Sequence, residues 1–95
     1  MSYNNKEYQY AYLTGASTNQ VFTGKGILHY ITVNAVGLAG SISIIDGIAG
    51  TTPNVGLITL SNSNIVTLHY DVYMATGLRI RQTNSPDITV CYEQG

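Results

Sequence analysis

Polar and apolar side chains alternate along several short runs of the chain, and the residues between these runs are rich in glycine, asparagine, serine and proline. Alternation over roughly four to eight residues is typical of β-strands that bury one face, and the intervening residue types are those that form turns. We therefore predict strands at 8–13, 20–23, 27–34, 41–45 and 55–60, and three more within 68–92. Turns and loops are predicted at 14–19, 24–26, 35–40, 46–54, 61–64 and 82–86.

About eight strands without a helical period favour an all-β fold over an α/β fold. We predict an antiparallel β-sandwich of jelly-roll type, because eight strands in about 90 residues suit that architecture. The stretch 68–92 has the densest run of apolar residues and is expected to form the centre of the core. An immunoglobulin-like sandwich is the alternative, although the chain has one cysteine and no tryptophan and so lacks that fold's usual residues.

Most of the chain is expected to form one domain. Residues 1–7 are polar and lack periodicity, which predicts a flexible N-terminal arm, and 8–95 are predicted to be a single β-sandwich domain. For a chain of 10.2 kDa, size scaling predicts about 5,300 Å² of exposed surface when folded and about 14,800 Å² when unfolded. Such a core is thin, so contacts with a neighbouring subunit would add useful stability.

Charged residues make up only 9% of the chain, and its net charge is −1. An ordinary soluble domain has about 25% charged residues; here threonine, asparagine, serine and glutamine supply 30 of the 95 residues instead. The basic residues are only Lys6, Lys25, Arg79 and Arg81. Without a basic stripe, neither nucleic acid nor an anionic membrane is an expected partner.

Three tyrosines at a spacing of two, Tyr8, Tyr10 and Tyr12, are predicted to lie along one face of the first strand. A tyrosine ring is apolar while its hydroxyl group tolerates water, so such a row can stack on sugars or form a contact between subunits. The alternative is structural, with the rings packed against the sheet beneath them.

Two histidines, His29 and His69, each lie in a Leu-His-Tyr triplet inside a predicted strand. Asp71 and Cys91 are the only plausible additional ligands, and the spacing resembles no metal site. A triad of Cys91, His69 and Asp71 would need a coincidence of folding, and a lone cysteine is most often a small buried apolar residue. We therefore predict no metal, no cofactor and no enzymatic activity.

Two further motifs have structural interpretations. Gly24–Lys25–Gly26 is too short for a phosphate-binding loop and no helix follows it. Arg79 and Arg81 alternate with Leu78 and Ile80, a pattern that marks the solvent face of a strand, although the two guanidinium groups could grip a carboxylate. The sequence also lacks the apolar run of a signal peptide or membrane helix, so synthesis in the cytoplasm is expected.

A series of strand and turn patterns runs in a fixed order through most of residues 10–92. It includes Gly-Ile-Leu-His at 26–29, Asp-Gly at 46–47, Thr-Gly-Leu at 76–78 and a closing Asp-Ile-Thr-Val at 87–90. In this order the patterns resemble those of small jelly-roll-like virion structural proteins of tailed phages. Those proteins are capsid decoration (cement) proteins or the bases of head fibres. This chain has Thr76 where the family more often has asparagine.

The resemblance implies a protein made in the host cytoplasm and located on the capsid surface of a virion. It implies a homotrimer bound to the major capsid protein, with a head-fibre protein as a further partner, and no catalytic residues. On this hypothesis the contact residues are Tyr3 and Lys6 in the arm and Tyr8, Tyr10 and Tyr12 in the first strand. A glycan-binding or host-attachment module, using the tyrosines and the loop 48–54, is the alternative function.

Overall fold

The computed structural model describes residues 8–37, 40–60 and 67–94, and these residues form eight β-strands and no helix. The strands are β1 (Gln9–Thr14), β2 (Ser17–Thr23), β3 (Gly26–Ala35), β4 (Ser41–Asp46), β5 (Gly56–Thr59), β6 (Thr67–Met74), β7 (Gly77–Gln82) and β8 (Asp87–Glu93). The predicted arm at 1–7 and the whole of the predicted turn at 61–64, together with residues 38–39, 65–66 and 95, lie outside the described residues.

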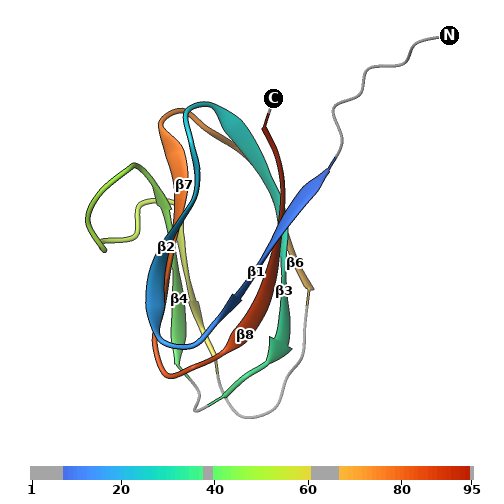
Figure 1. Cartoon of the computed structure of the whole chain (residues 1–95), viewed down its shortest axis with the longest axis vertical. Helices are drawn as coiled ribbons and strands as arrows, with labels where there is room; N and C mark the ends of the chain where they lie inside the picture. The colour runs from blue at the N-terminus through green and yellow to red at the C-terminus, as the bar shows by residue number, and fades with distance from the viewer. Residues whose placement is uncertain (1–7, 38–39, 61–66, 95) are drawn as a thin grey trace, which may run out of the picture.

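The strands form two four-stranded antiparallel sheets that pack face to face (Figure 1). Sheet A has the order β1-β8-β3-β6, and sheet B has the order β2-β7-β4-β5. The chain crosses between the sheets after almost every strand, as it does in a jelly roll. This confirms the predicted β-sandwich and rules out the immunoglobulin-like order, in which sequence neighbours share a sheet more often.

The core lies between the two sheets and is almost entirely aliphatic. Its buried side chains are Phe22, Leu28, Ile31, Val33, Val36, Ile42, Ile44, Leu60, Met74, Leu78, Ile80, Ile88 and Val90. Five of these thirteen come from the stretch 68–92 and eight from earlier in the chain, so the predicted stretch contributes strongly to the core without forming its centre alone. The accessible surface of 5330 Å² matches the area expected for a chain of this mass.

Two details differ from the prediction. Strand β2 begins at Ser17, so the predicted turn 14–19 is confined to Gly15 and Ala16. Gly15 has a φ of 81°, which makes a two-residue connection possible, and Ser17 then pairs with Gln82 on β7. In β4, Ser43 is buried as well as its isoleucine neighbours, with 4% of its surface exposed, because β5 and β7 flank it on both sides.

Strand β3 contains a bulge at His29. Leu28 pairs with Tyr92 of β8 and Tyr30 pairs with Cys91, so His29 has no partner on that strand. On the other side, two residues of β6, at 70 and 71, stand opposite His29. An inserted residue shifts the alternation of faces, and the side chains of His29 and Tyr30 therefore both project from the outer face of sheet A.

Candidate binding face

The outer face of sheet A carries most of the aromatic side chains that the core does not use. We call it the tyrosine face and define it by its aromatic residues Tyr8, Tyr10, Tyr12, Tyr30 and Tyr73, together with the polar side chains between them. Tyr10 lies opposite Cys91 on β8, which lies opposite Tyr30 on β3. One layer of this face thus crosses three strands.

The rings at the two edges of this face are exposed to an unusual degree. Tyr8, Tyr10 and Tyr12 are 63%, 74% and 58% exposed, and Tyr73 on β6 is 57% exposed. Within the described part of the chain, only Ile48 and Leu57 are other large apolar side chains of similar exposure. The structural alternative for the tyrosine row, in which the rings pack against the sheet, is therefore not supported for Tyr10 and Tyr12, whereas the Tyr8 ring does stack on His29 of β3. Tyr3 and Lys6, the other predicted contact residues, lie outside the described residues.

Hydrogen bonds between side chains order one end of the face. Tyr12 donates to the Asp87 carboxylate at 2.8 Å, and the Asn34 amide donates to the Thr89 hydroxyl group at 3.0 Å. The bond to the Asp87 carboxylate stabilises the neutral phenol and raises the pKa of Tyr12. Rings and directional polar groups therefore stand side by side on this end of the face.

A charged cluster occupies the other end, at the bulge. His29 Nδ1 is 2.9 Å from Asp71 Oδ1 on β6, and Nε2 is 3.1 Å from Glu93 Oε1 on β8. The Tyr8 ring stacks on the imidazole with 4.2 Å between ring centroids and 27° between planes. The hydrogen bond to Asp71, and secondarily that to Glu93, raises the pKa of His29 against the opposing effect of burial.

The second histidine has different neighbours. The His69 ring lies 5.6 Å from the Tyr30 ring, centroid to centroid, at an angle of 54°. Asp71 bonds to His29, so the His69–Asp71 pair that a catalytic triad would need is not formed. Cys91 is buried, with 5% of its surface exposed. A hydrogen bond between its thiol and the Tyr30 hydroxyl group raises the pKa of Tyr30. The buried position predicted for this cysteine is confirmed.

Charge is unevenly divided between the two outer faces. The tyrosine face carries the carboxylates of Asp71, Asp87 and Glu93. The outer face of sheet B carries the two arginines of β7: Arg79 donates to Gly50 O at 2.8 Å and to Gln20 Oε1 at 3.0 Å, and Arg81 is exposed. The prediction that both arginines mark an outer strand face is confirmed. The hydrogen bond to Gly50 also joins Arg79 to the loop between β4 and β5.

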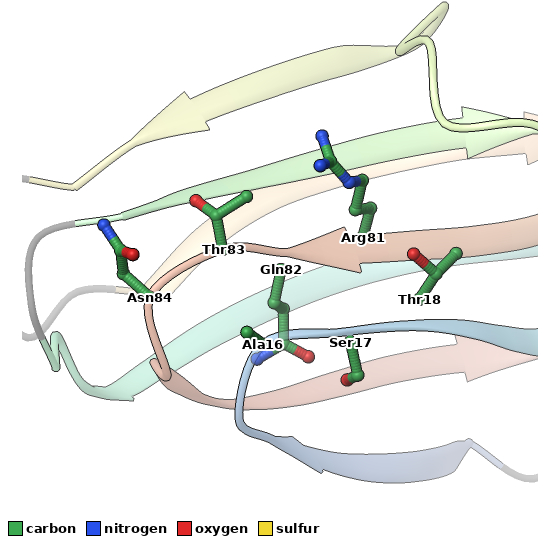
Figure 2. Close-up of a pocket in the computed structure, with 7 residues that line it drawn as sticks. All are labelled: Ala16, Ser17, Thr18, Arg81, Gln82, Thr83 and Asn84. Atoms are coloured by element: carbon green, nitrogen blue, oxygen red, sulfur yellow. The ribbon is translucent and has the colours of Figure 1, made fainter.

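A shallow hollow of about 300 Å³ lies at the end of sheet B, lined by Ala16, Ser17, Thr18, Arg81, Gln82, Thr83 and Asn84. Figure 2 shows that Gln82 points to the opposite side of β7 from Arg81 and Thr83, into the sandwich. The Thr83 hydroxyl group is already bonded to the backbone N–H of Ser41. The hollow is open and polar and contains no aromatic ring, so the tyrosine face is the stronger candidate for a binding site.

No family model, curated protein or solved structure matches the chain. Among the described residues, no group of three or more histidine, cysteine, aspartate or glutamate side chains is arranged to hold a metal ion. Nor is there, in that part of the chain, a helix long and apolar enough to cross a membrane.

Sequence reasoning found the tyrosine row but missed the cluster around His29. It considered Asp71 as a partner of His69, two residues away on the same strand, and as a possible metal ligand beside both histidines. The actual pairing joins residues 42 positions apart and depends on the bulge. The one sequence signal available was the presence of a histidine and an aspartate in two strands that both belong to the apolar core pattern.

Proposed function

We propose that this protein is a structural subunit of a phage virion, a capsid decoration protein that binds the outer capsid surface as a homotrimer and stabilises the head. The observation that carries the proposal is the tyrosine face, where Tyr8, just before β1, and Tyr10 and Tyr12 on β1 are 58–74% exposed although the fold has a complete core elsewhere. The resemblance to phage virion proteins supplies the identity of the partner, the major capsid protein.

Exposed tyrosines on the outer face of a sheet suit contact with protein. Contiguous apolar patches on monomers mark interaction sites, and tyrosine is among the residues enriched at protein interfaces and at their strongest contact positions. The low charge of the chain also suits a subunit held by many modest contacts. A face that supplies a row of rings along an edge strand can contact a second subunit or the capsid.

Stabilisation of the head follows from mass action. A protein that binds the assembled shell and not its dissociated subunits shifts the equilibrium towards the shell by its difference in binding free energy between the two states. Residues 1–7 continue directly into Tyr8, and we expect this segment to order on the capsid. Deletion of residues 1–7 should therefore lower capsid occupancy, and unchanged occupancy would contradict the role of the arm.

The test is the native mass of the full chain by light scattering over a dilution series. The proposal predicts a stable species at about three times the 10.2 kDa chain mass, because threefold capsid positions require that symmetry, and retention of that species on capsids prepared without the protein. A chain that stays monomeric and is not retained on capsids would overturn the proposal.

Glycan binding is the second candidate, and the polar end of the tyrosine face favours it. The Tyr12 ring stands beside the Asp87 carboxylate and the bonded Asn34 and Thr89 side chains, which combines a stacking surface with directional hydrogen bonds. The loop at 48–54 would not take part, because it joins β4 to β5 in sheet B (Figure 1). A glycan array that shows no ligand at millimolar concentration would exclude this candidate.

A further inference from the structure

His29 is held between carboxylates from both neighbouring strands of sheet A. Asp71 of β6 faces Nδ1 at 2.9 Å and Glu93 of β8 faces Nε2 at 3.1 Å. The histidine side chain is 13% exposed and Glu93 is 18% exposed, whereas Asp71 is 69% exposed. The remaining titratable group against the ring is Tyr8, and no lysine or arginine of the described residues bonds to any of these groups.

The two distances have a simple consequence for the protons on the ring. An imidazolium ion has two N–H groups and can donate to both carboxylates at once, whereas a neutral imidazole has one and turns a lone pair towards the other carboxylate. The observed arrangement therefore satisfies the doubly protonated ring and leaves the neutral ring with a repulsive contact. The geometry itself distinguishes the two charge states.

The contact between Tyr8 and His29 depends on the charge of the imidazole. Its ring stacks on the imidazole at 4.2 Å, and a cation over the face of an aromatic ring is attracted more strongly than a neutral ring would be. Tyr8 precedes β1 and has no strand partner of its own, since the pairing of β1 with β8 begins at Gln9. Its place on the tyrosine face thus depends chiefly on the ring beneath it.

Two backbone irregularities keep the cluster together. His29 is the bulged residue of β3, and Asp71 has a φ of 51°, in the left-handed region, which costs most residues other than glycine about 1 kcal/mol or more and which aspartate tolerates better than most. A regular ladder would avoid both. Strain of this kind persists where surrounding contacts hold it in place and often marks a functional feature.

We propose that His29 is a pH-dependent latch that holds Tyr8 on the tyrosine face when its ring carries two protons and releases Tyr8 when it loses one. The inference rests on the proposed function only in assigning Tyr8 to the docking surface. Below pH 6.5, the ordinary pKa of histidine, the latch is closed; it opens as the pH rises through the raised pKa of His29.

The experiment is an NMR titration of the His29 and Tyr8 ring resonances in the full chain. We expect a His29 midpoint above 6.5, a Tyr8 response with the same midpoint, and loss of the cross-relaxation signal between the two rings above it. Asp71→Asn should lower both midpoints together towards 6.5. His69→Gln is the matched control, because that histidine lies on the same face and bonds to no carboxylate among the described residues, and it should leave both midpoints unchanged.

A purely structural role for His29 would leave the cross-relaxation signal between the His29 and Tyr8 rings constant through the titration. That result, a His29 midpoint at or below 6.5, or an Asp71→Asn variant with unchanged midpoints would overturn the latch. The titration needs no capsid and no trimer. A working latch in a chain that never docks would overturn the proposed function alone, and a docking chain with an unresponsive Tyr8 would overturn the latch alone.

Discussion

The Tyr12 hydroxyl group donates a hydrogen bond to the Asp87 carboxylate across β1 and β8, with 2.8 Å between Oη and Oδ2. The bond fixes a ring that is 58% exposed before any partner arrives. Ordering a side chain in advance removes part of the entropy that binding would otherwise cost. Tyr12 is therefore expected to contribute more to docking than an unrestrained surface ring would.

Replacement of Tyr12 by serine tests the tyrosine face, and Leu57→Ser is its matched control. Leu57 is 57% exposed and lies on sheet B. Both variants should change the free energy of unfolding by no more than about 0.5 kcal/mol, as surface substitutions usually do. Tyr12→Ser should weaken trimer formation or capsid retention by about tenfold or more, since residues that dominate an interface contribute about 2 kcal/mol.

The measurement is light scattering and capsid co-sedimentation, with urea unfolding as the stability check. Equal docking by Tyr12→Ser and the parent chain would show that the tyrosine row is not the contact surface. Loss of docking in Leu57→Ser with Tyr12→Ser unaffected would move the contact to the outer face of sheet B.

A second prediction concerns Asp46, whose carboxylate closes the turn between β6 and β7. It accepts the backbone N–H groups of Ala75, Thr76 and Gly77 at 3.0, 2.8 and 3.2 Å. The bond from Ala75, followed by those from the other two amides, lowers the pKa of Asp46 against the effect of burial. The charged form is thus favoured in the folded chain.

Asp46→Ala should lower the free energy of unfolding by about 1–2 kcal/mol at neutral pH, because the three amides lose their charged acceptor at a site that water can reach. The parent's advantage is complete above pH 3.8, the ordinary pKa, and disappears as the pH falls through the lowered value. Urea unfolding of both chains over a pH series checks this, with Asp87→Ala as control. A difference that persists in strong acid would mean that the carboxylate charge is not responsible.

The strands and the core could be predicted because alternation with period two reports burial directly. The cluster at His29 could not be predicted from the sequence. Strict alternation from Leu28, which is buried, would turn Tyr30 inward and Ile31 outward. The bulge reverses this, so that Ile31 is fully buried and Tyr30 lies on the outer face. One inserted residue moves all the following side chains of the strand to the opposite face of the sheet, and no local residue pattern indicates the insertion.

Long-range side-chain bonds were equally hidden from the sequence. Asp46 is predicted to begin a turn, yet it is the last residue of β4 and pairs with Leu78, and its carboxylate caps a turn about thirty residues further along the chain. The tyrosine row was predictable as one face of a strand. Its exposure was not, because that depends on the absence of any cover over β1 among the described residues.

A third prediction compares two glycines. A Cβ atom on Gly40 would overlap the backbone carbonyl group of Thr83 and lie 2.6 Å from its carbon, and backbone cannot move aside cheaply. At Gly47 the nearest atom to such a Cβ is 3.5 Å away, an ordinary contact. Gly40→Ala should therefore lower the free energy of unfolding by about 1–3 kcal/mol.

Gly47→Ala should change it by less than about 0.5 kcal/mol, or raise it slightly by restricting the unfolded chain. Urea unfolding with a common m-value is the measurement. Equal stability of the two variants would show that the segment at Gly40 can withdraw from Thr83, and that the close approach of the loop before β4 to the end of β7 is not fixed.

The last prediction concerns Gln82, a polar side chain inside the sandwich with 2% of its surface exposed. Its Nε2 donates to Pro86 O at 2.9 Å, while Oε1 has no hydrogen-bond partner among the described residues. An amide tolerates one unbonded oxygen at a cost of about 1–3 kcal/mol. A carboxylate at the same position would have no donor, and its charge would also face the Pro86 carbonyl oxygen.

Gln82→Glu should thus lower the free energy of unfolding by about 3–5 kcal/mol at neutral pH, the usual cost of a buried charge without a partner. The free energy of unfolding of Gln82→Glu should recover in acid, since burial raises the pKa of such a carboxyl group and protonation restores a donor. Gln82→Met keeps a similar volume without charge and should cost no more than about 1.5 kcal/mol. Thermal and urea unfolding of the three chains at neutral and acidic pH decide the matter. A Gln82→Glu chain as stable as Gln82→Met at neutral pH would mean that the carboxylate finds a donor or reaches solvent, and that this end of the sandwich is not closed.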